Sequence, residues 1–310
     1  MAEYLVTGAA GFIGSAVANR LIELNHSVVT IDNLSTGYEQ NIPINCEFIK
    51  GDIQNPDTLE RLGSRFFDAI IHIAGQSSGE ISFEDPIYDL QTNTQSTLLL
   101  LQYARNNNCK NFIYASTMSV YGDQDDPYVN EQTNAYPKSF YAVGKLASEN
   151  YLRIFSEFGI QCTSLRLFNV YGIGQNMLNL KQGMLSIFIN MAITEKLVKV
   201  KGSKDRFRDF INIDDVVNAF ISSIDRKKGH SYEVYNISTG VKHSVEDLLR
   251  TIELKLPYDV AKEFLDGTPG DQFGIFGCNN KAKADLKWEP SVTFDAGIEQ
   301  MIKWALSLKL

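Results

Sequence analysis

Tyr141 and Lys145 are the two side chains in this sequence whose types and spacing best suit proton transfer. Because they lie four residues apart, they share one face of the helix that we expect from about residue 141 to residue 158. A lysine ammonium near a phenol favours the phenolate and lowers the phenol pKa from about 10. Tyr141 is therefore a candidate general base near neutral pH. A solvated surface pair is the alternative, because this spacing is common.

Two hydroxyls precede this helix in a position to hold a reacting group. Ser116 and Thr117 follow an apolar strand that we expect at residues 111–115, and a polar loop joins them to the helix. Either hydroxyl could hold a substrate hydroxyl against the oxygen of Tyr141. The sequence therefore predicts a proton-transfer site formed by a strand end and the start of a helix.

A glycine-rich turn near the N-terminus predicts a dinucleotide site. Three glycines follow an apolar strand at residues 4–6 and open a helix at about residues 12–24. Glycine allows positive φ and lets backbone amides approach a pyrophosphate, and the helix N-terminus adds partial positive charge. Any tight strand–helix turn could use three glycines, but the flanking elements favour dinucleotide binding. The predicted contacts of this turn are Gly8, Gly11, Phe12, Ile13 and Gly14.

Asp32 indicates which dinucleotide is bound. It ends a second apolar strand, at residues 27–31, and no Arg or Lys follows it until Lys50. A carboxylate at this position can accept hydrogen bonds from the adenosine ribose hydroxyls and repels a 2′-phosphate. These features favour NAD over NADP. The alternative is that Asp32 caps a turn at the end of the strand.

Further cofactor contacts are predicted where the next strands end. In open α/β sheets the cofactor binds outside the carboxyl ends of the strands. A carboxylate after the third strand would lie near the adenine amine, and ordinary loop chemistry is the alternative for every residue in this group. The predicted contacts at this edge are Asn33, Asp52, Ile53, Ala74, Gly75 and Gln76.

The order of the predicted elements indicates the fold. Apolar strands separated by helices are typical of a parallel sheet covered on both faces, which is a doubly wound α/β fold. After Asn169 this alternation gives way to a loop-rich region. We therefore expect a cofactor-binding domain at residues 1–168 and a smaller α/β substrate-binding lobe at residues 169–310, with some elements of the lobe returning to the first domain. The predicted strands lie at residues 4–6, 27–31, 47–49, 68–73, 111–115, 162–167, 210–213 and 232–237, and the predicted helices at about 12–24, 86–107, 141–158, 182–193, 214–224, 244–255 and 294–306.

The composition argues against several classes of protein. Of the 310 residues 44% are hydrophobic, as in folded domains, and 29 basic against 37 acidic residues give a net charge of −8. Such a charge disfavours a nucleic-acid partner. The scattered cysteines and histidines predict neither zinc nor a disulfide framework. No apolar run approaches the roughly 20 residues of a bilayer span and no signal peptide is recognisable, so we expect a cytoplasmic protein.

Several motifs together resemble the extended short-chain dehydrogenase/reductase family. They are TGAAGFIGS at residues 7–15, DNLSTG at 32–37, the Tyr141/Lys145 pair and LRLFNVYG at 165–172. Within that family the chain is similar, from about residue 4 to 304, to the NAD-dependent nucleotide-sugar epimerases and dehydratases, and most to the UDP-glucose 4-epimerases. The resemblance implies a Rossmann-type fold and tightly held NAD. It also implies a base at Tyr141, a supporting Lys145, a hydroxyl at Thr117 or Ser116, and a lysine-orienting Asn93.

The resemblance also limits the reaction. The 4,6-dehydratases of the family carry an acidic pair directly after the catalytic threonine, and decarboxylating relatives usually carry a glutamate one position further on. This chain has Met118 and Ser119 there. The resemblance therefore implies a UDP-hexose 4-epimerase that acts through a transient 4-keto sugar, on glucose/galactose-type sugars or on their N-acetyl or uronate forms. A reductase, dehydrogenase or dehydratase of the same family is the alternative, and a non-catalytic NAD sensor is a third.

The remaining implications concern the substrate and the assembly. The resemblance places Asn169 and Arg208 at the sugar-nucleotide diphosphate and Asp271 at the nucleotide ribose, with Ser77 and Thr117 also at the substrate. Thr268 stands where the family usually has arginine. Taken alone, Arg208 and Asp209 could form a salt bridge on a loop, and Asp271 could form a turn. The resemblance further implies a homodimer through the helices near residues 86–107 and 140–158, although a helix buried on two sides would explain the same leucine-rich run.

Overall fold

A seven-stranded parallel sheet forms the centre of the protein. The computed structural model describes residues 1–179, 183–226, 231–267 and 273–308. The strand order is β12-β7-β5-β4-β1-β2-β3, and every neighbouring pair is parallel. The doubly wound α/β fold is thereby confirmed. The strands are β1 (Glu3–Thr7), β2 (Ser27–Asp32), β3 (Glu47–Lys50), β4 (Ala69–His72), β5 (Asn111–Thr117), β7 (Gln161–Leu167) and β12 (Tyr232–Ile237).

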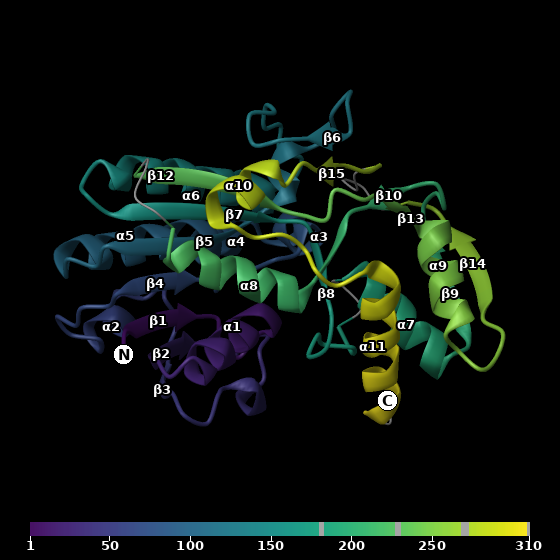
Figure 1. Cartoon of the computed structure of the whole chain (residues 1–310), viewed down its shortest axis with the longest axis horizontal. Helices are drawn as coiled ribbons and strands as arrows, with labels where there is room; N and C mark the ends of the chain where they lie inside the picture. The colour runs from purple at the N-terminus through teal and green to yellow at the C-terminus, as the bar shows by residue number, and fades with distance from the viewer. Residues whose placement is uncertain (180–182, 227–230, 268–272, 309–310) are drawn as a thin grey trace.

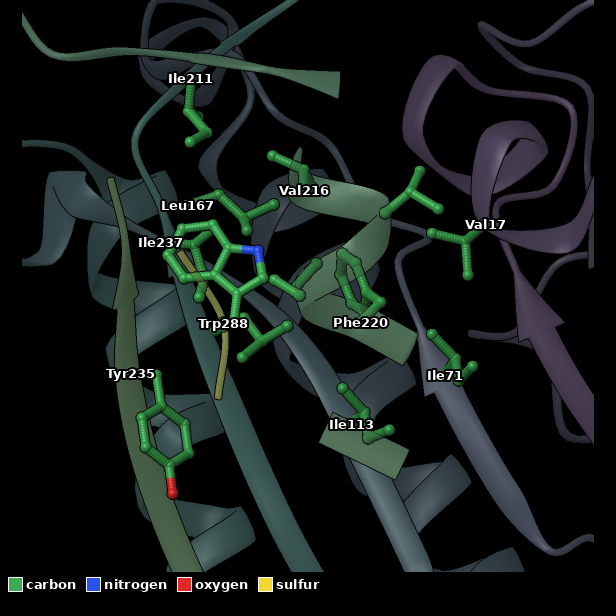
Figure 2. Packing of buried hydrophobic residues seen from close by; sticks show 14 of the residues in the cluster. Val17, Ile71, Ile113, Leu167, Ile211, Val216, Phe220, Tyr235, Ile237 and Trp288 are labelled. Carbon is green, nitrogen blue, oxygen red and sulfur yellow. The ribbon is translucent and has the colours of Figure 1, made fainter. Parts of the chain in front are cut away.

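Helices cover both faces of this sheet because its strands are apolar on both sides. On β1, Tyr4 and Val6 face one buried cluster whereas Leu5 faces the other, as the two-residue period of a strand requires. Figure 1 shows the helices over the sheet, and Figure 2 shows Phe220, Val216 and other buried side chains between α8 and the strands. The first cluster includes α1 (Phe12–Glu23), α8 (Ile213–Ile224) and α10 (Asn280–Leu286), and the second includes α2 (Pro56–Glu60), α5 (Ser96–Asn106) and α6 (Phe140–Ser156).

The single helix expected near residues 86–107 is interrupted. It consists of α4 (Pro86–Leu90), a π-helical turn η2 (Gln91–Gln95) and α5. Within η2, the backbone oxygen of Asn93 accepts hydrogen bonds from the side chains of Thr97, at 2.7 Å, and Ser148, at 3.0 Å. Single-turn π-bulges of this kind often occur at functional sites. A short helix, α3 (Gly79–Glu84), precedes α4.

A smaller lobe with its own buried cluster lies beside the sheet (Figure 1). It contains α7 (Met184–Thr194), α9 (Val245–Leu254) and α11 (Phe294–Ser307), together with the parallel pair β9 (Leu197–Lys201) and β14 (Ala261–Leu265). Three elements that follow residue 168 in the chain, β12, α8 and α10, belong to the sheet side rather than to this lobe. No helix in the described part of the chain is long and apolar enough to cross a membrane.

Short elements connect the two parts. Three pairs of short strands join distant segments: β11 (Phe210–Asn212) with β8 (Asn169–Tyr171), β10 (Phe207–Arg208) with β13 (His243–Ser244), and β15 (Phe276–Gly277) with β6 (Tyr128–Val129). Two 3-10 turns, η1 (Glu39–Asn41) and η3 (Met118–Tyr121), complete the described elements.

Candidate active site

The glycine turn between β1 and α1 is shaped by close backbone contacts. Gly8 has φ +76°, and a Cβ there would lie 2.8 Å from the backbone nitrogen of Ala74. A Cβ on Gly14 would lie 2.0 Å from the backbone oxygen of Gly8, so neither position accepts a side chain. Gly11 is the N-cap residue and provides no side-chain cap, and Phe12 and Ile13 begin the helix. The first amides of α1 are therefore available to an anion such as a pyrophosphate.

Asp32 links this turn to the end of β2. Its Oδ2 accepts a hydrogen bond from the backbone nitrogen of Ala10, at 2.9 Å, and its Oδ1 accepts one from Leu34, at 2.7 Å. The carboxylate thus lies beside the glycine turn and also caps the turn that follows the strand. Asn33 donates from Nδ2 to Oδ2 of Asp52 at 2.7 Å, which joins the ends of β2 and β3. The buried Ile53 follows Asp52.

The segment after β4 lies between the glycine turn and the candidate proton-transfer residues. Ala74 lies against Gly8, and a Cβ on Gly75 would lie 2.5 Å from Asn93 Oδ1 and 3.4 Å from Lys145 Nζ. The side chain of Gln76 points inward and donates from Nε2 to the backbone oxygen of Ser78, at 2.7 Å, and to Asp89, at 2.8 Å. Ser77 is exposed.

Tyr141 and Lys145 lie in the first turns of α6, whose N-cap is Ser139. Nζ of Lys145 donates to the backbone oxygen of Ala115 at 3.0 Å and lies 5.9 Å from the ring centroid of Tyr141. Lys145 is 4% exposed, and burial lowers its pKa to about 8. The buried ammonium group of Lys145 therefore links α6 to the end of β5.

The pKa of Tyr141 differs from the expectation based on spacing. Burial raises it to about 12, while a hydrogen-bond contact with Thr117 acts in the opposite direction. The protein's own groups therefore keep the phenol protonated at neutral pH. The sequence argument weighed the nearby ammonium and the positive nicotinamide ring of a bound cofactor but not the loss of solvation, which is the largest effect among the protein's own groups.

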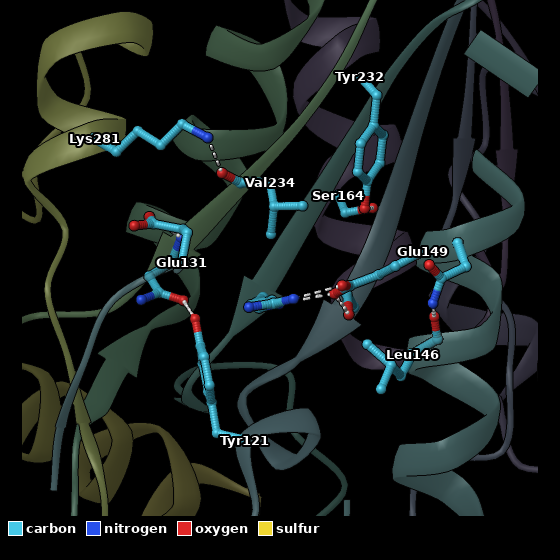
Figure 3. Close-up of polar contacts among 12 residues, drawn as sticks. Tyr121, Glu131, Leu146, Glu149, Ser164, Tyr232, Val234 and Lys281 are labelled. Carbon is cyan, nitrogen blue, oxygen red and sulfur yellow. Dashed lines mark hydrogen bonds and ion pairs between the residues drawn. The ribbon is translucent and has the colours of Figure 1, made fainter. Parts of the chain in front are cut away.

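The two candidate hydroxyls point in different directions because they are neighbours on a strand. Thr117 contacts Tyr141, whereas the hydroxyl of Ser116 donates to Glu149 at 2.5 Å. Glu149 also receives two hydrogen bonds from Arg166, Nε–Oε1 at 2.9 Å and Nη2–Oε2 at 2.7 Å (Figure 3). Sequence reasoning missed this buried ion pair, although Glu149 lies four residues after Lys145 on the same helix face.

The predicted substrate residues lie where the smaller lobe meets the sheet. Asn169 is on β8, and its Nδ2 donates to the backbone oxygen of Asp209 at 3.1 Å. Arg208 is buried and donates from Nη1 to the backbone oxygens of Phe207, at 2.8 Å, and Phe273, at 3.2 Å. Burial, and then the nearby Arg206, lower the pKa of Arg208 to about 10.

Asp209 lies between these segments, and sequence reasoning considered it only as a salt-bridge neighbour of Arg208. Its carboxylate accepts hydrogen bonds from the backbone nitrogens of Thr239, Gly240 and Gly277. Burial raises its pKa to about 6. Asp271 and Thr268 lie outside the described residues.

The chain is similar to known proteins along most of its length. Residues 4–238 match the model of the NAD dependent epimerase/dehydratase family. The chain is 32% identical over 302 residues to a putative UDP-glucose 4-epimerase of Methanocaldococcus jannaschii, covering 97% of each chain. Its fold is similar to UDP-glucose 4-epimerase of Thermotoga maritima with UDP-glucose, with a TM-score of 0.94, 32% identity and coverage of 99% of this chain and 100% of that one.

A second similar structure was solved with NAD bound. UDP-glucose 4-epimerase of Thermus thermophilus in complex with NAD is similar with a TM-score of 0.90 and 28% identity, covering 97% of this chain and 98% of that one. These comparisons confirm the resemblance to the nucleotide-sugar epimerases and dehydratases that the motifs indicated. They also confirm the dependence on NAD. Because the family model spans residues 4–238, about three quarters of the sequence, this protein belongs to the NAD dependent epimerase/dehydratase family.

Proposed function

We propose that this protein is an NAD-dependent UDP-hexose 4-epimerase. The observation that carries the proposal is the cluster of Tyr141, Thr117 and Lys145 where β5 meets α6. Positions 118 and 119, directly after Thr117, hold Met and Ser, which supply no acid–base pair for eliminating water. The cluster is sufficient for reversible oxidation of one carbinol, which is the chemistry that inversion at C4 requires.

Tyr141, Thr117 and Lys145 each have a separate role in the proposed proton transfer. The oxygen of Tyr141, as phenolate, would take the proton of the sugar 4-hydroxyl as C4 is oxidised and would return it when the 4-keto sugar is reduced on the opposite face. Thr117 holds the same hydroxyl by a hydrogen bond, and Lys145 provides the positive charge that stabilises the phenolate. Bound NAD supplies the hydride acceptor, then the hydride donor, and a positive ring that favours the phenolate.

The proposed cofactor site uses the edge of the sheet from the glycine turn to Lys145. Gly8, Gly11 and Gly14 leave the N-terminus of α1 open to the pyrophosphate, with Phe12 and Ile13 supplying amides. Asp32 would accept the adenosine ribose hydroxyls. The adenine would be bordered by Asn33, Asp52 and Ile53. The middle of the cofactor would be bordered by Ala74, Gly75 and Gln76.

The proposed nucleotide site uses Arg208 and Asn169 for the diphosphate. Arg206 and Arg208 lie close enough for one to lower the pKa of the other, which places two positive charges together in a chain of net charge −8. A guanidinium suits a phosphate because it binds two oxygens at once. Ser77, and Asp271 from outside the described residues, complete the proposed substrate contacts.

Incubation with a panel of UDP-hexoses without added cofactor tests the proposal. We expect inversion at C4, read by NMR, with no net change in bound NAD. Consumption of added NAD or NADH with a stoichiometric redox product would instead identify a reductase or dehydrogenase. Tyr141→Phe is the matched control, because it removes only the hydroxyl proposed as the base.

The proposal includes a homodimer in the cytoplasm. Large apolar side chains are exposed on the helices that the resemblance assigns to a dimer interface, among them Ile87 at 63%, Leu90 at 51% and Val143 at 50%. Phe83 and Phe140 extend this surface with rings 5.6 Å apart. Four free cysteines suit a reducing compartment. Light scattering should give twice the chain mass, and Val143→Asp should shift the mass toward the monomer, with Val241→Asp as the exposed control outside this surface.

A further inference from the structure

Asp89 is a buried carboxylate to which the proposed proton transfer gives no role. It lies on α4, just before the π-helical turn, and is 1% exposed. Its Oδ1 accepts hydrogen bonds from Gln76 Nε2, at 2.8 Å, and Asn93 Nδ2, at 3.0 Å, whereas Oδ2 has no hydrogen-bond partner among the described residues. A carboxylate this deeply buried needs a compensating charge nearby.

Lys145 supplies that compensating charge. Burial lowers the pKa of Lys145 and raises that of Asp89, and each of the two charges acts against the shift of the other. Oδ2 of Asp89 lies over Gly144, where a Cβ would be 3.5 Å from it. Since Gly144 directly precedes Lys145, the unpaired oxygen lies beside the helix segment that carries both proposed proton-transfer groups.

Asp89 also fixes the orientation of a neighbouring amide. Nδ2 of Asn93 donates both to Asp89 and, at 2.9 Å, to the backbone oxygen of Gln76. Because both partners are acceptors, they hold the amino end of the amide and leave Oδ1 on the other side. That oxygen borders the space beside Gly75 that Lys145 Nζ also borders. The amide of Asn93 is therefore held with its acceptor oxygen at the space beside Gly75, which the ammonium of Lys145 also borders.

We propose that Asp89 is a positioning residue of the proton-transfer site, whose charge keeps Lys145 protonated and whose Oδ1 holds the Asn93 amide in place. The proposal rests on the proposed roles of Tyr141 and Lys145. These two are the ionisable groups that face Asp89 from α6. His72 on β4 is neutral, since burial lowers its pKa to about 3.

The sign of the effect follows from the charges. Without the negative charge of Asp89, the ammonium of Lys145 loses its proton at lower pH. The phenolate of Tyr141 also forms at lower pH, because Asp89 acts to raise the pKa of that phenol. In the profile of turnover rate against pH, the rising limb, set by Tyr141, and the falling limb, set by Lys145, should therefore both move toward lower pH. A purely structural role would lower the rate at every pH and leave the limbs where they are.

Asp89→Asn is the variant that isolates the charge. Asparagine has the same size and keeps an oxygen for Gln76 and Asn93. Glu60→Gln, at an exposed position on α2, is the control for a change in overall charge. The titration of Lys145 is followed by NMR in NAD-loaded protein with ¹³Cε-lysine, assigned with Lys145→Met. We expect its midpoint to fall by about 1 pH unit or more in Asp89→Asn and to stay unchanged in Glu60→Gln.

The same two variants are compared in turnover across pH. We expect the profile of Asp89→Asn to shift to lower pH with KM nearly unchanged. An unshifted Lys145 midpoint, or a uniform loss of kcat without a shift, would overturn the proposal. The NMR titration needs no turnover, so it separates this proposal from failure of the proposed epimerase activity. If Asp89→Asn does not fold, Asp89→Glu keeps the charge and should hold the midpoint near that of the wild type, and a fall of about 1 unit there would overturn the proposal.

Discussion

Replacing Glu149 with alanine removes the carboxylate around which two strands and a helix are joined. Arg166 on β7 donates to it twice, at 2.9 and 2.7 Å, and Ser116 on β5 donates once, at 2.5 Å. Arg166 is 6% exposed, so its charge would remain in a region of low dielectric without its partner. Breaking a buried pair in this way costs about 3–5 kcal/mol. We expect Glu149→Ala to lower the free energy of unfolding by that amount.

Urea unfolding followed by circular dichroism, at one fixed NAD concentration, measures this loss. Glu157→Ala, at the exposed end of the same helix, is the control and should change the free energy by less than about 0.5 kcal/mol. A double variant, Glu149→Leu with Arg166→Met, removes both charges and should be more stable than Glu149→Ala. A loss below about 1 kcal/mol in Glu149→Ala, or a double variant no more stable than the single one, would refute the reasoning.

Three further predictions follow from the site. Tyr141→Phe should keep its fold and bound NAD but lose turnover by about 10²–10⁴-fold, and near wild-type turnover would exclude Tyr141 as the base. Asp32→Ala should narrow the preference for NAD over NADP mainly by weakening NAD, as calorimetry on cofactor-stripped protein can measure; equal wild-type affinities would remove Asp32 from the ribose. Burial raises the pKa of Asp209 to about 6 from its ordinary 3.8, so between these values the folded state binds more protons and stability falls as pH rises. Asp209→Asn should flatten that fall in unfolding measurements at pH 4 to 7, and an unchanged slope would contradict it.

The sheet was predictable because most of its strands contain a short apolar run, such as residues 4–6 in β1 and residues 69–71 in β4. The interruption of the helix near residue 93 was not, because the groups that bind the Asn93 carbonyl include Ser148, which lies 55 residues away. The pairing of β14 with β9 was also missed. Every residue of β14 is exposed, and its sequence, AKEFL, does not alternate apolar with polar residues, so the sequence gives no indication of its partner strand.

The shared helix face of Tyr141 and Lys145 was predictable from their spacing, but the pKa values of the two side chains were not. Spacing shows that two charges are near each other and says nothing about burial, which raises the pKa of Tyr141 and lowers that of Lys145. The alternation of side chains along β5 indicates that only one of Ser116 and Thr117 can face Tyr141. Which one does so depends on the placement of α6, which only the structure gives.

The most direct test of the account is the fate of the hydrogen at C4 of the sugar. UDP-glucose is incubated with the protein in D₂O without added cofactor, and the products are examined by NMR. The account predicts inversion at C4 with the original hydrogen retained, because hydride leaves and returns within one site while only the hydroxyl proton passes through Tyr141. Deuterium at C4, or product formed only when cofactor is consumed, would contradict it.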